Sequence, residues 1–193
     1  MKHTKFFKTV VLLLVVVLFT TSCQTPESKK GVQLSDSARR DQGAHKILFK
    51  DSIPQAHGYV NDYDLVYTPA QKATLDSLIG DFEKETTMQI VIIAFNSTMV
   101  EIDSLESTTM KIANIWRVGQ KDKNNGIAIG ICRDCRKMTI QNGSGTEKIL
   151  SNAETKQIID NSFIPGFKEG NYFEGTLNGL KALISTLKKK LGL

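Results

Sequence analysis

The sequence contains few of the residues on which common catalytic sites depend. It has three histidines, and only His57 lies at the edge of the part that is long enough to fold. A G-x-S-x-G nucleophile elbow, a Walker phosphate loop and a complete G-x-G-x-x-G fingerprint are all missing. The sequence therefore offers little from which to build a Ser/His/Asp or Cys/His catalytic site.

An excess of charge of one sign is also missing from the part that folds. The chain of 193 residues carries 25 Lys and Arg against 20 Asp and Glu, a formal charge of +5. Residues 58–193 hold sixteen basic and sixteen acidic residues, so the excess belongs to the first 57 residues. This distribution disfavours a basic nucleic-acid-binding domain, and we expect no nucleic-acid partner.

The longest apolar run, Val10–Phe19, has ten residues and is too short to span a bilayer. It follows a lysine-containing N-terminal region and ends in Thr20-Thr21-Ser22-Cys23. This order is typical of a secretory signal, and it resembles the lipobox of bacterial lipoproteins, although Thr20 stands where a leucine is usual. We predict a lipoprotein signal peptide over residues 1–22 and lipidation of Cys23. A plain secretory signal with an incidental cysteine is the alternative.

A lipid on Cys23 would place the rest of the chain outside the cytoplasm, anchored to a bacterial membrane and facing the periplasm or the cell surface. Residues 23–54 are mixed polar and basic without sustained periodicity, which predicts a flexible tether. Residues 55–193 are long enough for one domain with its own core.

The folding part alternates between helical and strand patterns. Thr68-Pro69 starts a helix that continues to about Thr86, because Thr68 can cap it and proline suits the first turn. Two continuous apolar runs, Gln89–Phe95 and Ile127–Cys132, predict strands that are buried on both faces. Lys137–Asn142 alternates and predicts a hairpin with the second run.

Four further helices are expected. They run from Asp103 or Ser104 to Gly119, near Glu147–Leu150, from Ala153 to about Phe163, where Pro165-Gly166 ends the helix, and over Tyr172–Lys190. The residues expected to face inward are Leu105, Ile112, Ile115 and Trp116 in the first of these, and Phe173, Leu177, Leu180, Ile184 and Leu187 in the last. The whole pattern predicts an α/β sandwich with a small mixed sheet between helices.

Cys132-Arg133-Asp134-Cys135 is the most unusual short motif. One cysteine pair cannot complete a tetrahedral zinc site, and a redox C-x-x-C normally lies at a helix N-terminus rather than between two strands. In an oxidising compartment Cys132 and Cys135 can form a local disulfide. We favour a structural or incidental pair over a redox pair.

Carboxylates and oxygen-rich turns are the remaining candidates for chemistry. Asp62 precedes the first helix, Glu147 follows a Gly-x-Gly turn, Asp160 lies in a helix, and Asn124-Asn125-Gly126 precedes a strand. Such oxygen donors suit Ca²⁺ or Mg²⁺. From spacing alone, surface solvation or helix capping is the favoured interpretation for each acid. Gly143-Ser144-Gly145 is likewise read as a tight turn rather than an anion cradle.

Four motifs in order resemble those of the TPM domain family. They are Gly58-Tyr59-Val60-Asn61-Asp62, Trp116-Arg117-Val118-Gly119 with Asn124-Asn125-Gly126, Gly143-Ser144-Gly145-Thr146-Glu147, and Ile164-Pro165-Gly166-Phe167-Lys168-Glu169-Gly170-Asn171-Tyr172. The resemblance covers about residues 55–188 and implies a three-layer α/β/α sandwich with a central four-stranded sheet. The family includes a thylakoid-lumen acid phosphatase and many bacterial envelope proteins. Some members bind divalent cations through an acidic cluster.

The chain departs from the family pattern at three acids. Asn124 stands in a turn that usually reads Asp-Asn-Gly, and Asn152 and Asn161 stand where acids are usual. Each replacement keeps an oxygen but removes a charge, which weakens cation affinity. The resemblance thus implies at most a weak Ca²⁺ or Mg²⁺ site, with Asp62, Asn124, Glu147 and Asp160 as its ligands.

Two hypotheses about function follow. The favoured one is a membrane-tethered, non-catalytic binding or assembly module that contacts another envelope protein. The alternative is a metal-dependent acid phosphatase on the same fold, which rests on family resemblance alone. Phosphoryl transfer depends on charge neutralisation, so a site short of carboxylates and histidine favours the first hypothesis.

Overall fold

The computed structural model describes residues 53–193, and the predicted signal peptide, Cys23 and the predicted tether up to residue 52 lie outside them. Four strands form one sheet in the order β1-β2-β3-β4. Their bounds are Val60–Asp62, Gln89–Phe95, Gly126–Cys132 and Lys137–Asn142. The first three strands are parallel and β4 is antiparallel to β3, so the sheet is mixed.

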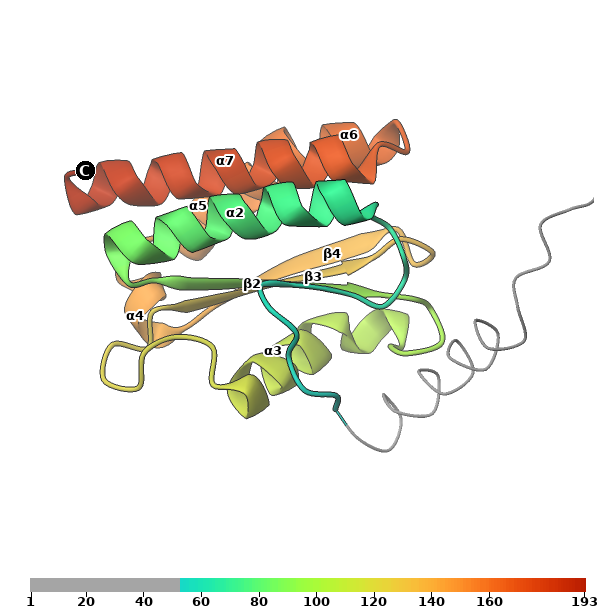
Figure 1. Cartoon of the computed structure of the whole chain (residues 1–193), viewed down its shortest axis with the longest axis horizontal. Coiled ribbons are helices and arrows are strands. Elements are labelled where there is room, and N and C mark those ends of the chain that lie inside the picture. The colour runs from blue at the N-terminus through green and yellow to red at the C-terminus, as the bar shows by residue number, and fades with distance from the viewer. Residues whose placement is uncertain (1–52) are drawn as a thin grey trace, which may run out of the picture. The chain divides into compact units, whose positions relative to one another are not determined.

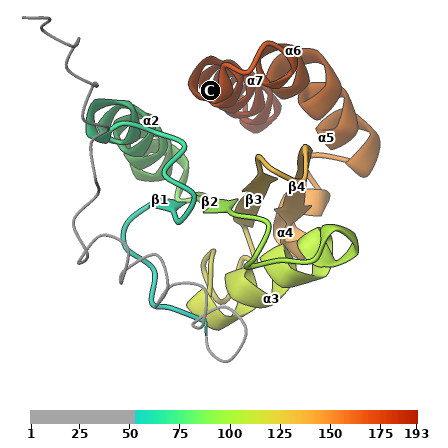
Figure 2. The same ribbon diagram turned by 90° about the vertical axis from the view of Figure 1, so that its right-hand side faces the viewer.

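Helices cover both faces of the sheet. They are α2 (Pro69–Thr86), the single turn η1 (Ile102–Ser104) leading into α3 (Leu105–Trp116), α4 (Ser144–Glu147), α5 (Asn152–Ile158), the π-helical turn η2 (Ile159–Phe163), α6 (Ile164–Lys168) and α7 (Tyr172–Leu191). Figure 1 and Figure 2 show α2 and α5–α7 on one face and α3 on the other. The predicted α/β/α sandwich with a four-stranded mixed sheet is confirmed.

The continuous apolar runs are buried on both faces because each face packs against a different helical layer. Ile90 and Ile92 point to a core shared with α2 and α7, whereas Ile93 and Phe95 point to a second core with Leu105 of α3. Successive strand residues face opposite sides, so one seven-residue strand serves both cores. Each isoleucine buried in this way contributes about 1.5–3 kcal/mol.

The start of α2 follows the predicted capping chemistry. The Thr68 side chain accepts a hydrogen bond from the backbone N–H of Gln71, and the Gln71 side chain accepts one from the N–H of Thr68. This reciprocal arrangement satisfies two of the donors that a helix leaves open at its first turn. The helix runs from Pro69 to Thr86, as predicted.

The structure corrects the end that was predicted for the fourth helical segment. The chain stays helical through Pro165 as far as Lys168 instead of ending after Phe163. Ile164 donates its N–H to the Ile159 carbonyl, five residues back, which makes a wide π-helical turn. This wide turn comes directly before Pro165, which has no N–H to donate. The helix can therefore continue through the proline.

Two smaller predictions also differ. Ile115 was predicted to face inward but is 54% exposed. The buried face of α3 is formed by Leu105, Thr109 and Ile112, and Ile115 lies outside this face. The strand β1 was not predicted from the residue pattern. Its three residues are too few to show alternation, and its place in the sheet comes from pairing with β2.

Two described residues before the predicted boundary at residue 55 also contact the domain. Ile53 packs against the α3 core, and the Pro54 carbonyl accepts a hydrogen bond of 2.7 Å from the Trp116 indole. In the described part of the chain, the helices are all too short or too polar to cross a membrane.

Candidate functional site

The carboxyl ends of the three parallel strands meet at one edge of the sheet, on the right in Figure 1. Asp62 ends β1, Asn96 follows β2, and Arg133 and Asp134 follow β3. Open α/β sheets bind their ligands beyond this edge. We therefore take this carboxyl edge as the candidate site.

Asp62 organises the loop between β1 and α2. Its two carboxylate oxygens accept hydrogen bonds from the backbone N–H groups of Val66 (3.0 Å) and Tyr67 (2.9 Å). These two hydrogen bonds fix the loop that contains Leu65. This residue has a φ of 52° and is 71% exposed. A left-handed conformation costs a residue with a Cβ roughly 1–2 kcal/mol. The hydrogen bonds to Asp62 therefore maintain a strained backbone at Leu65, whose apolar side chain points outward.

Asp64 and Arg133 form the electrostatic centre of the edge. The Asp64 side chain is 7% exposed, and its Oδ2 lies 3.1 Å from Arg133 Nε, although not in hydrogen-bond geometry. Burial raises the pKa of Asp64 from 3.8 to about 6, and Arg133 opposes part of this rise. Asp134 also lies near Arg133, with its Oδ1 3.9 Å from the same Nε, and it accepts a hydrogen bond from the Ser97 hydroxyl.

Three tyrosines border the carboxyl edge. Burial raises the pKa of Tyr63 to about 12. The Tyr67 hydroxyl lies 2.8 Å from the Thr176 hydroxyl, which ties the β1–α2 loop to α7. Tyr172 donates to the Arg133 carbonyl at 3.4 Å. The edge is therefore anchored to helices that lie far away in the sequence.

The opposite, amino edge of the sheet contains the Asn124-Asn125-Gly126 and Gly143-Ser144-Gly145 motifs, on the left in Figure 1. Asn125 is 5% exposed; its amide donates to the Thr87 carbonyl, and its Oδ1 accepts from the Gln120 N–H. A Cβ on Gly126 would lie 2.1 Å from the Val118 carbonyl oxygen. These residues pack backbone against backbone.

The remaining predicted ligands are exposed near the amino edge or on α5–η2. Asn124 and Glu147 are both exposed. Glu147 lines a shallow pocket of about 330 Å³ together with Asn152 and Lys156. Asp160 pairs with Lys156 at 2.6 Å. These acids have the solvated or ion-paired surroundings of ordinary surface carboxylates.

The four residues that were predicted to share a cation do not come together. Asp62 pairs with Ala94 in the sheet, whereas Asn124 lies beyond Gly126, which pairs with Gln89. The five residue steps from Gln89 to Ala94 correspond to roughly 17 Å of strand. Both oxygens of Asp62 also accept backbone N–H groups. This arrangement does not favour a single Ca²⁺ or Mg²⁺ site with these four ligands, and within residues 53–193 no three His, Cys, Asp or Glu side chains are grouped to hold an ion.

Cys132 and Cys135 are joined by a disulfide that closes the β3–β4 turn. Cys132 is fully buried, and Arg133 and Asp134 lie between the two cysteines. The bridge therefore restrains the turn that carries Arg133 to the carboxyl edge.

Residue patterns in the sequence did not identify Asp64, Leu65 and Arg133 as a group. The available signal was the Asp-x-Asp spacing of Asp62 and Asp64 directly after a strand, but that strand was not recognised. Arg133 was noted only as part of the cysteine motif. Their proximity depends on the parallel pairing of β1, β2 and β3.

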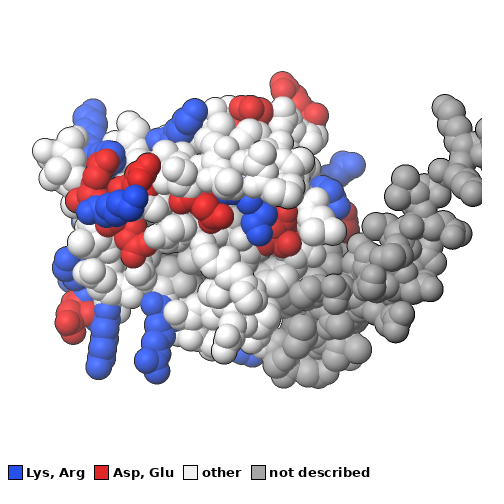
Figure 3. Space-filling model, in the orientation of Figure 1, with Lys and Arg blue, Asp and Glu red and all other residues white. Residues whose placement is uncertain are grey.

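The surface charge is mixed. Figure 3 shows acidic and basic side chains next to one another on the face that it draws. Ion pairs such as Lys84–Asp81, at 3.0 Å, are part of this mixture. The even balance of sixteen acids and sixteen bases in residues 58–193 is consistent with such a surface.

Comparison with known proteins identifies one family. The model of the TPM domain matches residues 60–186, about two thirds of the chain. None of the curated proteins matches the chain.

Several solved structures share the fold. The N-terminal domain of a P. gingivalis protein, solved by NMR, is 27% identical, with a TM-score of 0.63 over 69% of this chain and 84% of that one. The BA42 protein from Bizionia argentinensis is 18% identical, with a TM-score of 0.57 over 66% and 85%. The N-terminal domain of the cg2496 protein from Corynebacterium glutamicum is 14% identical, with a TM-score of 0.52 over 70% and 84%. The last two show the fold alone.

Proposed function

The chain belongs to the TPM domain family, and from that premise we propose that residues 53–193 are a non-catalytic binding or assembly module. A lipid on Cys23 holds the module at a bacterial membrane, where it faces the periplasm or the cell surface. Its partner is another envelope protein, which contacts the loop between β1 and α2. The observation that carries this proposal is the exposed, strained Leu65.

The sequence of the first 23 residues supports the anchoring. A lysine-containing start, the apolar run Val10–Phe19 and small residues before Cys23 are the features of a lipoprotein signal. The polar residues after Cys23 form a linker that can extend the module away from the membrane surface. These features lie outside the described residues and support the proposal through the sequence only.

The surroundings of Leu65 support a protein partner. A protein interface has an apolar centre with a polar rim, and Leu65 lies in the same edge as Asp64, Arg133 and Asp134. Two hydrogen bonds from the loop backbone to Asp62 maintain the outward conformation. Strain of this kind persists where the surrounding structure fixes it, and it is concentrated at functional sites.

No cation is part of this proposal. The predicted Ca²⁺ or Mg²⁺ ligands are separated along the sheet, and Asp62 already uses both oxygens within its own loop. The residues present therefore do not fit the acidic cation cluster that the family resemblance implies, and we assign no step to a metal.

Photo-crosslinking in native membranes tests the binding role. The full chain carries benzoylphenylalanine in place of Leu65, and the matched control carries it in place of Ile115, which is 54% exposed on α3. We expect a discrete crosslinked band with one envelope protein at position 65 and no such band at position 115. The partner is then identified by mass spectrometry.

A second variant distinguishes a specific contact from non-specific crosslinking. Leu65→Asp in a chain that carries the crosslinker at a nearby exposed position, Ala70, should remove the band, because the apolar contact is lost. Equal crosslinking from positions 65 and 115, or a band that survives Leu65→Asp, would contradict the proposal.

An acid phosphatase remains the second candidate, because Asp64 has the property of an acid catalyst. Its pKa of about 6 and its contact with Arg133 place a protonatable carboxyl group beside a cation that can bind phosphate. Turnover of p-nitrophenyl phosphate by the full chain, with and without Ca²⁺ or Mg²⁺, tests it. Under our proposal there is no turnover above the rate of the Asp64→Asn variant. Turnover that this variant abolishes would favour the phosphatase.

A further inference from the structure

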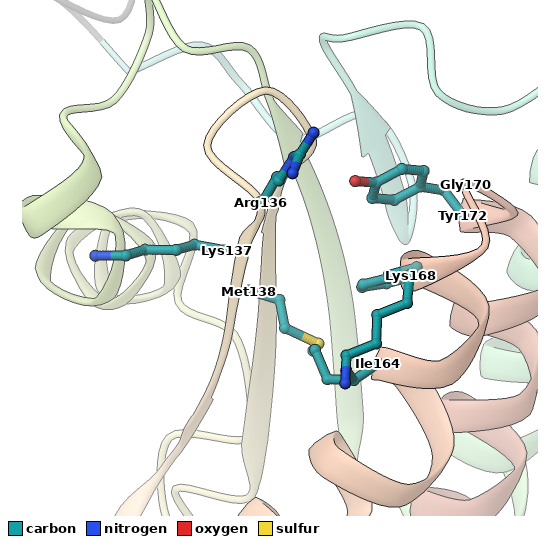
Figure 4. A pocket seen from close by; sticks show the side chains of 8 residues that line it. Arg136, Lys137, Met138, Ile164, Lys168, Gly170 and Tyr172 are labelled. Carbon is teal, nitrogen blue, oxygen red and sulfur yellow. The ribbon is translucent and has the colours of Figure 1, made fainter.

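A hollow of about 500 Å³ lies between the β3–β4 hairpin and the segment that joins α6 to α7. Arg136, Lys137 and Met138 line it from the hairpin, and Ile164, Phe167, Lys168, Gly170 and Tyr172 line it from the helices (Figure 4). Small-molecule pockets have volumes of roughly 300–1,000 Å³. Leu65 is not among the lining residues, so the hollow is distinct from the surface in the proposed function.

Two stacked aromatic rings form part of the helical wall of the hollow. The Phe167 and Tyr172 rings stack with their centroids 4.8 Å apart and an angle of 25° between the ring planes. Figure 4 shows the Met138 side chain extending from the hairpin toward Ile164. A stacked aromatic pair opposite a flexible thioether suits the hydrocarbon body of a ligand, especially an aromatic ring.

The charges around the hollow are all positive. Three of the eight lining residues are basic and none is acidic. Lys137 directs its ammonium group away from the hollow in Figure 4, toward the Ile102 carbonyl at 3.2 Å and Asp103 at 3.4 Å. Arg136 and Lys168 have no carboxylate partner among the ion pairs of residues 53–193.

We propose that this pocket binds a small organic carboxylate with an apolar, preferably aromatic, body. The carboxylate pairs with Arg136, whose planar guanidinium can hold both oxygens. Figure 4 shows the Lys168 ammonium group beside Ile164, at the other end of the pocket, so Lys168 adds to the positive charge of the pocket without contacting the same carboxylate. The body covers the Phe167–Tyr172 pair and Met138. An inorganic anion such as phosphate would leave this apolar wall exposed, so the lining favours an amphiphilic monoanion.

Calorimetric titration of the full chain in lipid nanodiscs tests the proposal, with empty nanodiscs as the blank. The probes are phenylbutyrate and its neutral amide, which have the same body but differ in charge. We expect saturable binding of phenylbutyrate and binding of the amide that is weaker by about tenfold, because the amide lacks the charge that Arg136 and Lys168 recognise.

Variants locate the binding in this pocket. The double variant Arg136→Gln/Lys168→Gln should weaken phenylbutyrate binding by about tenfold, since both residues are exposed and each ion pair contributes modestly. Lys181→Gln, which removes an exposed lysine of α7 outside the pocket, should leave the affinity unchanged. Ile164→Trp fills the pocket and should abolish binding.

Three results would overturn the proposal. They are phenylbutyrate heats no larger than those of the empty nanodiscs, equal affinities for the acid and the amide, and a folded Arg136→Gln/Lys168→Gln variant that binds like the wild type. Circular dichroism of each variant verifies that it is folded.

Discussion

The two edges of the sheet use polar residues in different ways. At the amino edge, Asn125 is buried with both ends of its amide bonded, and Gly126 lets two backbone segments touch. At the carboxyl edge, Leu65 is exposed in a left-handed conformation, and burial disfavours the charged form of Asp64. Left-handed residues with a Cβ occur at the amino edge as well, at Thr87 and Asn124. The carboxyl edge differs because it exposes a large apolar side chain in this conformation next to a buried carboxylate.

This difference indicates which family motifs serve the fold and which serve a partner. The Asn-Gly motif looks like a set of oxygen donors in the sequence, and the Gly-x-Gly motif was predicted to be a tight turn. The structure uses both to pack loops. The Asp62 motif looks like a metal ligand, but it holds a loop whose tip is strained. Mutations at the two edges should therefore have opposite effects on stability.

The largest effect is expected from Gly126→Ala at the amino edge. A Cβ there would lie 2.1 Å from the Val118 carbonyl oxygen, and backbone cannot move aside as a flexible side chain can. We expect a loss of about 3 kcal/mol or more in the free energy of unfolding, measured by urea denaturation. Ser144→Ala, at an exposed position of the same edge, is the control, and an equally stable Gly126→Ala chain would contradict the packing role.

A smaller loss is expected from Asn125→Ala. The substitution leaves the Thr87 carbonyl and the Gln120 N–H, whose hydrogen bonds to Asn125 are partly buried, without their amide partner. Each such group costs roughly 1–3 kcal/mol, and we expect about 2–3 kcal/mol in total. Asn124→Asp, at the exposed neighbour, should change stability by less than about 0.5 kcal/mol. A larger loss in the free energy of unfolding for Asn124→Asp than for Asn125→Ala would contradict the packing role of Asn125.

Much of the fold could be predicted because it depends on long local patterns. The central strands are continuous β-branched runs, and α2 begins with a complete capping box, so their type and bounds follow from neighbouring residues. The helix through Pro165 could not be predicted in this way. Its continuity depends on a π-helical turn, whereas the local rule for proline predicts an end.

The candidate site was less predictable because it depends on contacts between distant segments. Asp62 was identified as a notable acid, but its role depends on two N–H groups in a loop whose shape is not visible in the sequence. The separation of Asp62 from Asn124 requires the register of β1 and β3 against β2. A list of acids in sequence order carries no such information.

Leu65→Gly should raise stability at the carboxyl edge. Glycine adopts the left-handed conformation without the steric cost that leucine has, and we expect a gain of up to about 1 kcal/mol in the free energy of unfolding. The same variant should lose the crosslinked partner band, with the crosslinker placed at the exposed Ala70. This combination is the expected trade between stability and function.

Arg117→Gly is the matched control for strain relief. Arg117 is also exposed and left-handed, with a φ of 55°, at the end of α3. It should gain similar stability and keep the partner band. A Leu65→Gly chain that is less stable than the wild type, or that still forms the band, would show that Leu65 is neither strained nor a contact residue.

The smallest expected effect concerns pH and Asp64. The unfolded chain has the ordinary aspartate pKa of 3.8, whereas the folded chain holds this proton until about pH 6. Protonated Asp64 therefore contributes stability below about pH 4, and that contribution is lost as the pH rises to about 6.

Asp64→Asn removes the titration, so the stability of this variant should fall less than that of the wild type over this range. Because the half-exposed Arg133 guanidinium stabilises the ionised carboxylate, we expect a difference of less than about 1 kcal/mol at pH 7, read from urea midpoints. Asp103→Asn, at a carboxylate that is 93% exposed, should keep the wild-type slope. Parallel curves for the wild type and Asp64→Asn would mean that Asp64 titrates as an ordinary surface acid, and the carboxyl edge would then have lost one of the two features that distinguish it from the amino edge.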